Sequence, residues 1–223
     1  MNKNEDMKRL AIYGTGGAGI EIYEMIITSS LVNEWKDIVF IDDTIEEGLF
    51  ESREVLPFEN FAAKYSCEDT EIVIAVGEPK SRQMLSEKVC KAGYGLGIVI
   101  SKTALVSPSA IIEEGSVVLD RTIVSSRAKI GKNSFLNGTA IVGHDVTIGE
   151  NCQICSFSIV AGHAKIGNNV FIGASSCVRE DTSVGDDAIV SMGAIVLKDI
   201  RAGYTAMGNP AREIARSTDG VFK

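Results

Sequence analysis

The 223-residue chain has few of the residues that build metal centres or nucleic-acid interfaces. It contains only two histidines, too few for a zinc site with three histidine ligands in one chain, so we expect no metal. Its 30 acidic residues outnumber 22 basic ones and no basic run occurs, which argues against a nucleic-acid partner. No apolar stretch near the polar N-terminus is long enough for a signal peptide or a membrane span. We therefore expect a cytoplasmic protein.

The five cysteines are scattered along the chain, and their odd number does not make a disulfide framework, which fits a reducing compartment. Cys152 and Cys155 form a C-x-x-C spacing, but no second pair and no suitably spaced histidine accompany them. Cys152 also occupies a small inward position of the repeat described next. We therefore interpret this pair as structural.

A six-residue repeat fills the second part of the sequence. Every sixth position from Val106 to Val196 holds Val, Ile or Leu without a break, and the fourth residue after each is nearly always small. One branched and one small residue per unit suit a short β segment followed by a bend, and three units close a triangular coil of about 18 residues. The pattern predicts a parallel β-helix, a β-solenoid whose coils lie about 4.8 Å apart.

The first part of the chain predicts a small α/β unit. Expected strands lie at 8–13, 37–41, 71–76 and 96–100, and expected helices lie at 20–30 and 81–93. About four parallel strands make half of a Rossmann fold, enough to hold one nucleotide. We place a Rossmann-like nucleotide-sugar-binding domain at 1–104. The β-helix domain with its closing C-terminal segment then occupies 105–223.

Two motifs in this α/β unit suggest nucleotide binding. Gly14–Gly19 matches G-x-G-x-x-G between a strand and a helix, which lets backbone N–H groups approach a pyrophosphate. Asp42 and Asp43 end the second strand, where such folds contact the ribose or base, and Gly77 follows the third strand at the same edge. A plain tight turn and a solvated acidic turn are the alternative interpretations.

The repeat contains one candidate for general-base chemistry. His144 occupies an outward position near a corner and is followed by Asp145, and a neighbouring carboxylate fixes the tautomer of an imidazole and increases its basicity. Gly162 lies one coil later and should expose its backbone N–H to a ligand on the prism wall. His163 is expected at the solvent or ligand edge. A surface histidine without a role is the alternative for His144.

Several segments together resemble the bacterial sugar O- and N-acetyltransferases. They are Gly14–Gly19, FIDD at 40–43, AVG at 75–77, SPSA at 107–110, Asn137, His144-Asp145, Gly162 and MGNPAREI at 207–214. The likeness covers nearly the whole chain. It is closest to the nucleotide-linked 4-amino-sugar acetyltransferases of bacillosamine biosynthesis, with sialic acid O-acetyltransferases and perosamine N-acetyltransferases as relatives. The resemblance implies a left-handed β-helix, acetyl-CoA as co-substrate and no metal.

The resemblance also implies roles for individual residues. His144 would be the general base, Asp145 its supporting carboxylate, and Asn137 an amide close to the acceptor. The residues assigned to a UDP-linked sugar are Gly16, Gly17, Ala18, Asp42, Asp43 and Gly77. Those assigned to acetyl-CoA are Gln153, Gly162, Ala174 and the turn Gly208-Asn209-Pro210-Ala211.

Two positions depart from the pattern of many relatives, which carry histidine at Ala18 and at Gln153. Ala18 cannot donate a hydrogen bond to a sugar or phosphate through its side chain, so the identity of the sugar stays open. Gln153 can still donate to a thioester or pantetheine group but cannot titrate.

We predict an acetyl-CoA-dependent enzyme that acetylates the 4-amino group of a nucleotide-linked deoxy sugar by direct attack, since no cysteine falls in the column of His144. Flat prism faces suit a homotrimer with active sites between prisms. O-acetylation of a sugar such as sialic acid is one alternative. A non-catalytic nucleotide-binding scaffold is the other, and the His144 group of residues argues against it.

Overall fold

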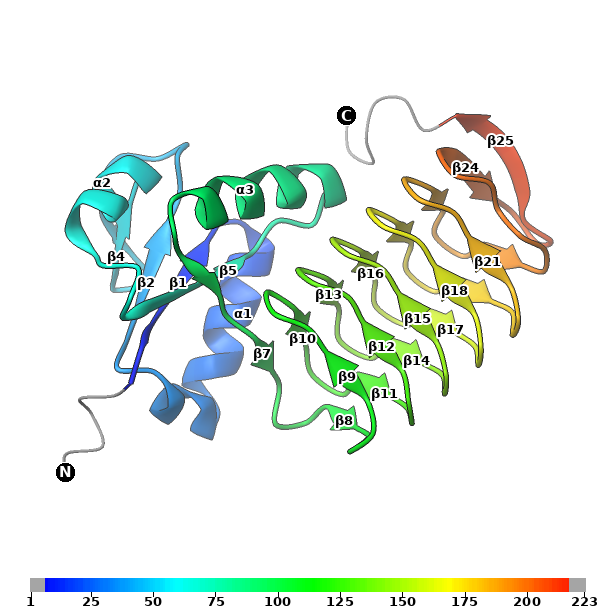
Figure 1. Ribbon diagram of the computed structural model, residues 1–223, viewed down its shortest axis with the longest axis horizontal. Helices are drawn as coiled ribbons and strands as arrows, with labels where there is room; N and C mark the ends of the chain where they lie inside the picture. Colours follow the sequence, from blue (N-terminus) through cyan, green and yellow to red (C-terminus); the bar gives the residue numbers. More distant parts are fainter. Residues whose placement is uncertain (1–6, 217–223) are drawn as a thin grey trace.

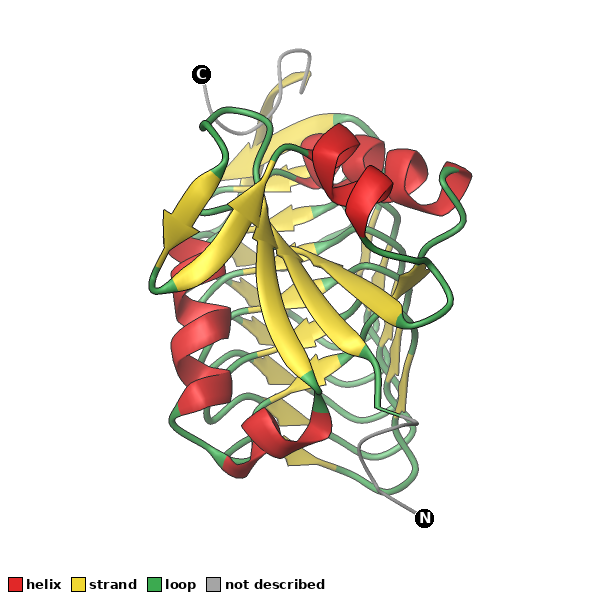
Figure 2. Cartoon of the chain, turned by 90° about the vertical axis from the view of Figure 1, so that its left-hand side faces the viewer, coloured by secondary structure: helices red, strands yellow, loops and turns green. Residues whose placement is uncertain are grey.

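In the computed structural model, which describes residues 7–216, the first part of the chain forms a sheet with helices on both of its faces (Figures 1 and 2). Its strands are β1 (Arg9–Tyr13), β2 (Asp37–Ile41), β3 (Gly48–Phe50), β4 (Arg53–Leu56), β5 (Thr70–Ile74) and β6 (Gly95–Leu96). Its helices are α1 (Gly17–Ile27), the 3-10 helix η1 (Ser30–Glu34), α2 (Phe58–Lys64) and α3 (Pro79–Lys91).

The sheet has the strand order β3-β4-β2-β1-β5-β6, and all neighbours are parallel except the β3–β4 hairpin. Residues 10–12 of the central strand β1 are fully buried, because apolar side chains cover both faces of the sheet. The four expected strands are present. The structure adds β3, β4 and α2, which come from a stretch whose short apolar runs carry no regular period.

The repeat forms a triangular β-helix, as predicted. The first residue of each two-residue strand points outward, and the second is the periodic aliphatic residue that packs in the core. The third residue after each aliphatic adopts a left-handed conformation at the corner, from Arg121 (φ 56°) to Asp187 (φ 57°). This conformation turns the chain into the next strand.

The β-helix has three flat faces, to which we give names. The docked face comprises β7 (Val99–Ile100), β10 (Val117–Val118), β13 (Phe135–Leu136), β16 (Gln153–Ile154), β19 (Phe171–Ile172), β22 (Ile189–Val190), β24 (Tyr204–Met207) and β25 (Arg212–Arg216). The open face comprises β8 (Leu105–Val106), β11 (Ile123–Val124), β14 (Ile141–Val142), β17 (Ile159–Val160), β20 (Cys177–Val178) and β23 (Ile195–Val196). The polar face comprises β9 (Ile111–Ile112), β12 (Lys129–Ile130), β15 (Thr147–Ile148), β18 (Lys165–Ile166) and β21 (Ser183–Val184).

The α/β unit packs on the first coils of the docked face. Val99, Val117 and Phe135 join β1, β2 and α1 in one apolar cluster. The expected strand at 96–100 is divided between the two parts, because β6 pairs with β5 whereas β7 pairs with β10. The β-helix therefore begins at Val99, before the boundary we placed after residue 104.

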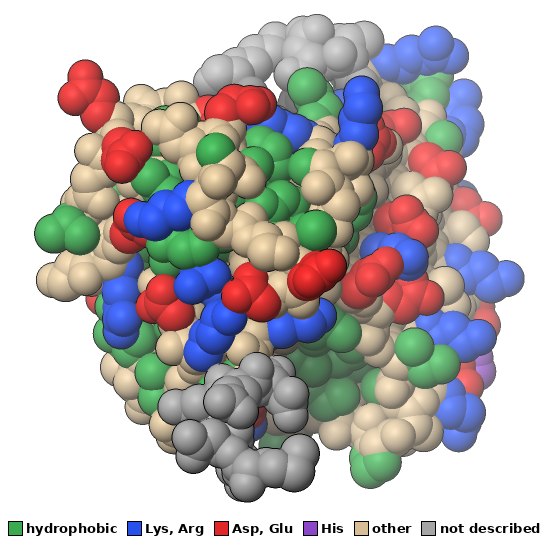
Figure 3. Space-filling model, turned by 60° about the vertical axis from the view of Figure 1, so that its left-hand side comes forward, with side chains coloured by type: hydrophobic (Ala, Val, Ile, Leu, Met, Phe, Trp, Pro, Cys, Tyr) green, Lys and Arg blue, Asp and Glu red, His purple; other side chains and the backbone are tan. Residues whose placement is uncertain are grey.

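Residues 1–6 and 217–223 of the two expected domains lie outside the described residues. Within 7–216, we find no helix with the length and apolarity needed to cross a membrane. Acidic and basic side chains are interspersed over the side of the molecule seen in Figure 3.

Candidate functional site

A pocket of about 420 Å³ opens at the carboxyl edge of the α/β sheet. β1 leads directly into the glycine loop, and α1 begins at Gly17, so the N-terminus of this helix borders the pocket. The pocket lining includes all six residues expected to bind the nucleotide-linked sugar: Gly16, Gly17, Ala18, Asp42, Asp43 and Gly77. A helix N-terminus with free backbone N–H groups suits an anionic ligand.

The glycines of the loop are suited to their positions for different structural reasons. A Cβ added at Gly19 would lie 2.0 Å from the carbonyl oxygen of Gly14, so only glycine allows this close approach of helix and strand. A Cβ at Gly16 or Gly17 would meet nothing within 4 Å. The backbone of these two residues therefore faces open space, where a ligand can approach.

Asp42 and Asp43 both accept hydrogen bonds from other residues of the protein. Asp42 accepts hydrogen bonds from the backbone and hydroxyl of both Thr15 and Thr44, at 2.6–3.0 Å. Partial burial would raise the pKa of Asp42, but these bonds outweigh it and hold that pKa below its usual value. Asp42 thus fixes the glycine loop.

Asp43 ties three elements together. It accepts from the Tyr13 hydroxyl, from Lys88 Nζ at 2.8 Å and from the Phe58 backbone at 2.8 Å. Partial burial would raise the pKa of Asp43, but the bonds from Lys88 and Tyr13 hold it below its usual value. Tyr13 and Lys88 were missed in the sequence, because an ordinary strand residue and an ordinary helix residue carry no motif.

Two further cavities continue this pocket along the prism. One of about 290 Å³ shares Gly17, Ala18 and Gly77 with it and reaches Asn137 and Gln153 on the β-helix. The other, of about 680 Å³, runs between α1 and the corners around 119–121, 137–139 and 156–157. The cavities of about 290 and 680 Å³ both have Asn137 in their lining. The glycine loop and Asn137 therefore lie along one groove.

His144 and Asp145 lie at the corner between the open face and the polar face, which we call the catalytic corner after the role predicted for His144. His144 Nδ1 is 2.8 Å from Asp145 Oδ2, and Arg127, one coil earlier, binds both carboxylate oxygens at 2.6 and 2.8 Å. The left-handed conformation of Asp145 (φ 58°) turns the backbone here, so the adjacent His144 and Asp145 side chains meet, as predicted. Arg127 and then His144 hold the pKa of Asp145 far below its usual value.

Gly162 makes room for the imidazole of His144. A Cβ at Gly162 would lie 2.8 Å from His144 Nε2, so the ring occupies the space of the missing side chain. The His163 ring meets the His144 ring edge-on at 4.9 Å. His144, Asp145 and His163 are close enough to hold a metal ion, but the Arg127 cation on the same carboxylate opposes a second cation.

The remaining predicted residues lie elsewhere on the prism. Asn137 and Ala174 belong to the groove corner, between the docked and open faces; the Ala174 carbonyl accepts from Gly193 N at 2.8 Å. The turn at Gly208 and Pro210 closes this corner, where the Gly208 carbonyl accepts from Ile195 N at 3.0 Å.

Gln153 lies on the docked face and is only 4% exposed. Its two amide ends contact Arg82 and Asn137, so it lies neither at the corner of Gly162, between the open and polar faces, nor beside Ala174 in the groove corner. Within one chain, the open face separates the catalytic corner from Asn137.

The cysteines near the groove are protonated thiols. Burial raises the pKa of Cys155 to about 11, and that of Cys152, which packs in the prism core, to about 12. Neither is a thiolate nucleophile at neutral pH, which agrees with direct attack on the acyl donor.

Comparison with known families divides the chain in the same way. Residues 9–89 match the PglD N-terminal domain, 127–162 match the bacterial transferase hexapeptide (six repeats), and 163–198 match the hexapeptide repeat of succinyl-transferase. These matches and the stacked parallel strands confirm the predicted fold class, a Rossmann-like unit followed by a left-handed β-helix of hexapeptide repeats.

Solved structures match over nearly the full length. The acetyltransferase domain of PglB from Neisseria gonorrhoeae FA1090 is 30% identical, with a TM-score of 0.87 over 93% of this chain and 100% of that domain, and it is also known with acetyl coenzyme A. A mutant of perosamine N-acetyltransferase from Caulobacter crescentus, in complex with CoA and GDP-perosamine, is 25% identical, with a TM-score of 0.85 over 92% and 96%. WeeI from Acinetobacter baumannii AYE is 27% identical, with a TM-score of 0.85 over 93% and 100%.

Proposed function

Because this chain belongs to the PglD-like family of hexapeptide-repeat sugar acetyltransferases and is an acetyl-CoA-dependent sugar N-acetyltransferase, we propose that it acetylates the 4-amino group of a UDP-linked deoxy sugar, with His144 as general base. The observation that carries this proposal is the continuous groove from the glycine loop to Asn137. It suits a ligand with an anionic diphosphate at one end and a sugar at the other.

The hydrogen bonds of His144 support its role as base. Asp145 is ionised and accepts from Nδ1–H, which leaves the lone pair on Nε2 for the proton of the acceptor amine. As the amine attacks the thioester carbonyl, an N–C bond forms, the C–S bond breaks, and the amine proton passes to Nε2. His144 can then return that proton to the departing CoA thiolate.

The open face supports a homotrimer with shared active sites. Its outward side chains are Leu105, Ile123, Ile141, Ile159, Cys177 and Ile195, all apolar. The polar face instead presents Lys129, Thr147, Lys165 and Ser183 after Ile111. Packing the apolar row against a second prism would bring the catalytic corner of one chain to the groove corner of its neighbour.

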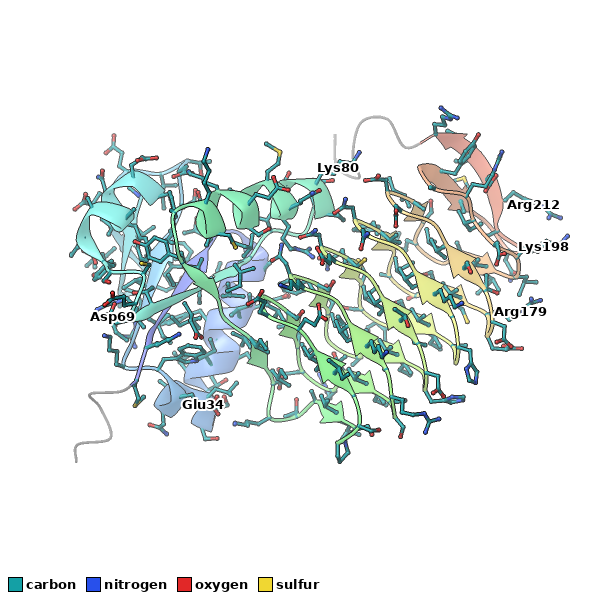
Figure 4. All side chains as sticks on the ribbon, viewed as in Figure 1. Glu34, Asp69, Lys80, Arg179, Lys198 and Arg212 are labelled. Carbon is teal, nitrogen blue, oxygen red and sulfur yellow. The ribbon has the colours of Figure 1, made fainter. Side chains whose placement is uncertain are left out.

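Acetyl-CoA would lie along the prism edge. His144 and Lys198 are three coils apart in the same corner column, which is about 14 Å at strand spacing. Arg179, Lys198 and Arg212 extend from the end of the prism that is far from the α/β unit (Figure 4). These cations suit the phosphates of CoA while the thioester lies beside His144. The five free cysteines fit a cytoplasmic setting for this reaction.

The decisive experiment offers three acceptors side by side with acetyl-CoA and follows thiol release. They are a UDP-linked 4-amino-4,6-dideoxy sugar, a GDP-linked 4-amino sugar and free sialic acid. We expect the UDP-linked sugar to be turned over fastest, because the nucleotide supplies remote binding energy that positions the amine. Preference for the GDP-linked sugar would correct the nucleotide only. Preference for sialic acid would replace N-acetylation by O-acetylation, and binding of nucleotide without any transfer would favour a scaffold.

A further inference from the structure

Arg82 of α3 is a buried cation without a carboxylate partner among the described residues. Its side chain is 1% exposed, and all five of its N–H donors meet neutral acceptors. The acceptors are the carbonyl oxygens of Val76 (2.8 Å), Gly77 (3.2 Å), Asn133 (3.5 Å) and Cys152 (2.8 Å), and Gln153 Oε1. Burial lowers the pKa of Arg82 to about 10, so the guanidinium stays charged at neutral pH. Burying a charge costs free energy, so stability alone does not account for the position of this group.

The contacts of Arg82 connect the two parts of the site. Gly77 lines both the nucleotide pocket and the cavity that follows it, and Gln153 lines that cavity from the β-helix side. The guanidinium lies behind both and bonds to each of them. A lysine could not replace it, because three rotating donors cannot match five acceptors held in a planar arrangement.

The hydrogen-bond chemistry of this chain of contacts allows only one orientation for each amide. Arginine can only donate, so the Gln153 atom that faces it must be Oε1, and Nε2 then faces Asn137. The Asn137 atom that receives Nε2 must be Oδ1. Asn137 Nδ2 has no hydrogen-bond partner within residues 7–216, and Asn137 lines the groove.

We propose that Arg82 is a positioning residue that fixes the amides of Gln153 and Asn137, so that Asn137 presents only N–H donors to the sugar. This inference rests on the proposed function, since it assigns the sugar to the groove. It identifies the sugar substituent at Asn137 as a hydrogen-bond acceptor, such as a carbonyl or hydroxyl oxygen. It also moves Gln153 from the acyl donor to the positioning of the acceptor.

Gln153→Glu is the sharpest test. The new carboxylate still accepts from Arg82 but has no donor for Asn137, so the Asn137 amide turns and presents its oxygen to the groove. We expect KM for the nucleotide-linked sugar to rise about 10-fold, with KM for acetyl-CoA unchanged. Stability should be maintained, because the carboxylate pairs with the buried cation. A rise in KM for acetyl-CoA alone, or an unchanged KM for the sugar, would overturn the proposal.

Gln153→Met is the matched control, because it leaves the buried Arg82 guanidinium with an unpaired donor and removes the donor to the partly buried Asn137 amide. We expect its melting temperature to be lowest, and that of Gln153→Glu to be equal to or above the wild-type value. Only the wild type should keep a low KM for the sugar, so ranking the three proteins by melting temperature and by KM should give different orders. If Gln153 had a merely structural role, the two rankings would agree.

A double-mutant cycle with Asn137→Ala completes the test. This single change also removes the N–H donor from the groove, so adding it to Gln153→Glu should raise KM for the sugar little more than either change alone. Effects on KM that multiply in the double mutant would contradict the proposal that Gln153 acts through Asn137. If the wild type turned over no nucleotide-linked sugar, the proposed function would fail. The melting temperatures would still test the pairing of Arg82 with Gln153. A lower melting temperature for Gln153→Glu than for Gln153→Met would overturn that pairing.

Discussion

The α/β unit and the β-helix build their parts of the site in opposite ways. The pocket at the glycine loop is lined by segments of one chain, and its polar groups are held by Asp42, Asp43 and their partners. The catalytic corner projects His144 into solvent, with 58% of the side chain exposed, beside a flat apolar face. Under the proposed function, one chain would therefore suffice to bind the nucleotide, whereas acetyl transfer would require a second chain.

The largest expected effect concerns the exposed base. His144→Ala should lower kcat by roughly 100-fold or more, because general-base catalysis contributes about 10²–10⁴, while KM for acetyl-CoA and binding of the nucleotide change little. Steady-state kinetics and calorimetry with the nucleotide measure these quantities. His163→Asn is the control and should have a much smaller effect. Near-normal turnover by His144→Ala would eliminate the proposed mechanism.

The next prediction tests whether assembly completes the site. Ile159→Glu places a charge in the apolar row of the open face and should convert a trimer into single chains, as light scattering would show. Turnover should fall about 10-fold or more, because an isolated chain lacks the corner that a neighbouring chain would contribute to the active site. Nucleotide binding should be retained. Lys165→Glu on the polar face is the control. A monomeric wild type at micromolar concentration would contradict the proposal that a second chain completes the site.

Gly162→Ala tests the fit of the base in its corner. The added methyl group would lie 2.8 Å from His144 Nε2 and must displace the ring, so kcat should fall roughly 10-fold. Thermal unfolding should change little, since the ring is exposed and can move. Gly95→Ala, where the methyl group meets nothing within 4 Å, is the control. Equal kcat values for both variants would show that the ring does not need this space.

In the pocket at the glycine loop, the corresponding change should affect stability instead. Gly19→Ala places a methyl group 2.0 Å from a backbone oxygen that cannot move freely and should lower the free energy of unfolding by about 1–3 kcal/mol. Gly17→Ala has open space and should leave that free energy nearly unchanged. Denaturant unfolding compares the two. A stable Gly19→Ala protein would show that the loop is less tightly fitted than its geometry indicates.

The smallest expected effect is on pH dependence. The folded state lowers the pKa of Asp42 and Asp43, so both contribute stability at pH values above their unfolded pKa, and this is lost as the pH falls through their folded pKa. Asp42→Asn should therefore flatten the loss of stability below about pH 4. Unfolding measured at several pH values checks this. An unchanged pH profile would mean that the loop does not depend on the charge of Asp42.

The β-helix and the local chemistry of each motif could be predicted from the amino-acid sequence. A six-residue period specifies which side chains enter the core, because each coil packs only on its neighbours, 18 residues away. The pairing of His144 with Asp145 and the lining of the pocket by the glycine loop were predictable for a similar reason: the partners are close in the chain or at successive strand ends.

How these parts meet depends on contacts between segments that are far apart in the chain. The hairpin β3–β4 and the division of 96–100 depend on which sheet has a free edge, and no local pattern records that. Arg82 looks like any helix residue until α3 packs over β16 and buries it against Gln153. Likewise, the period alone could not show that His144 and Asn137 lie on opposite sides of the open face, because that distance depends on how the coil closes and which side of the prism remains uncovered.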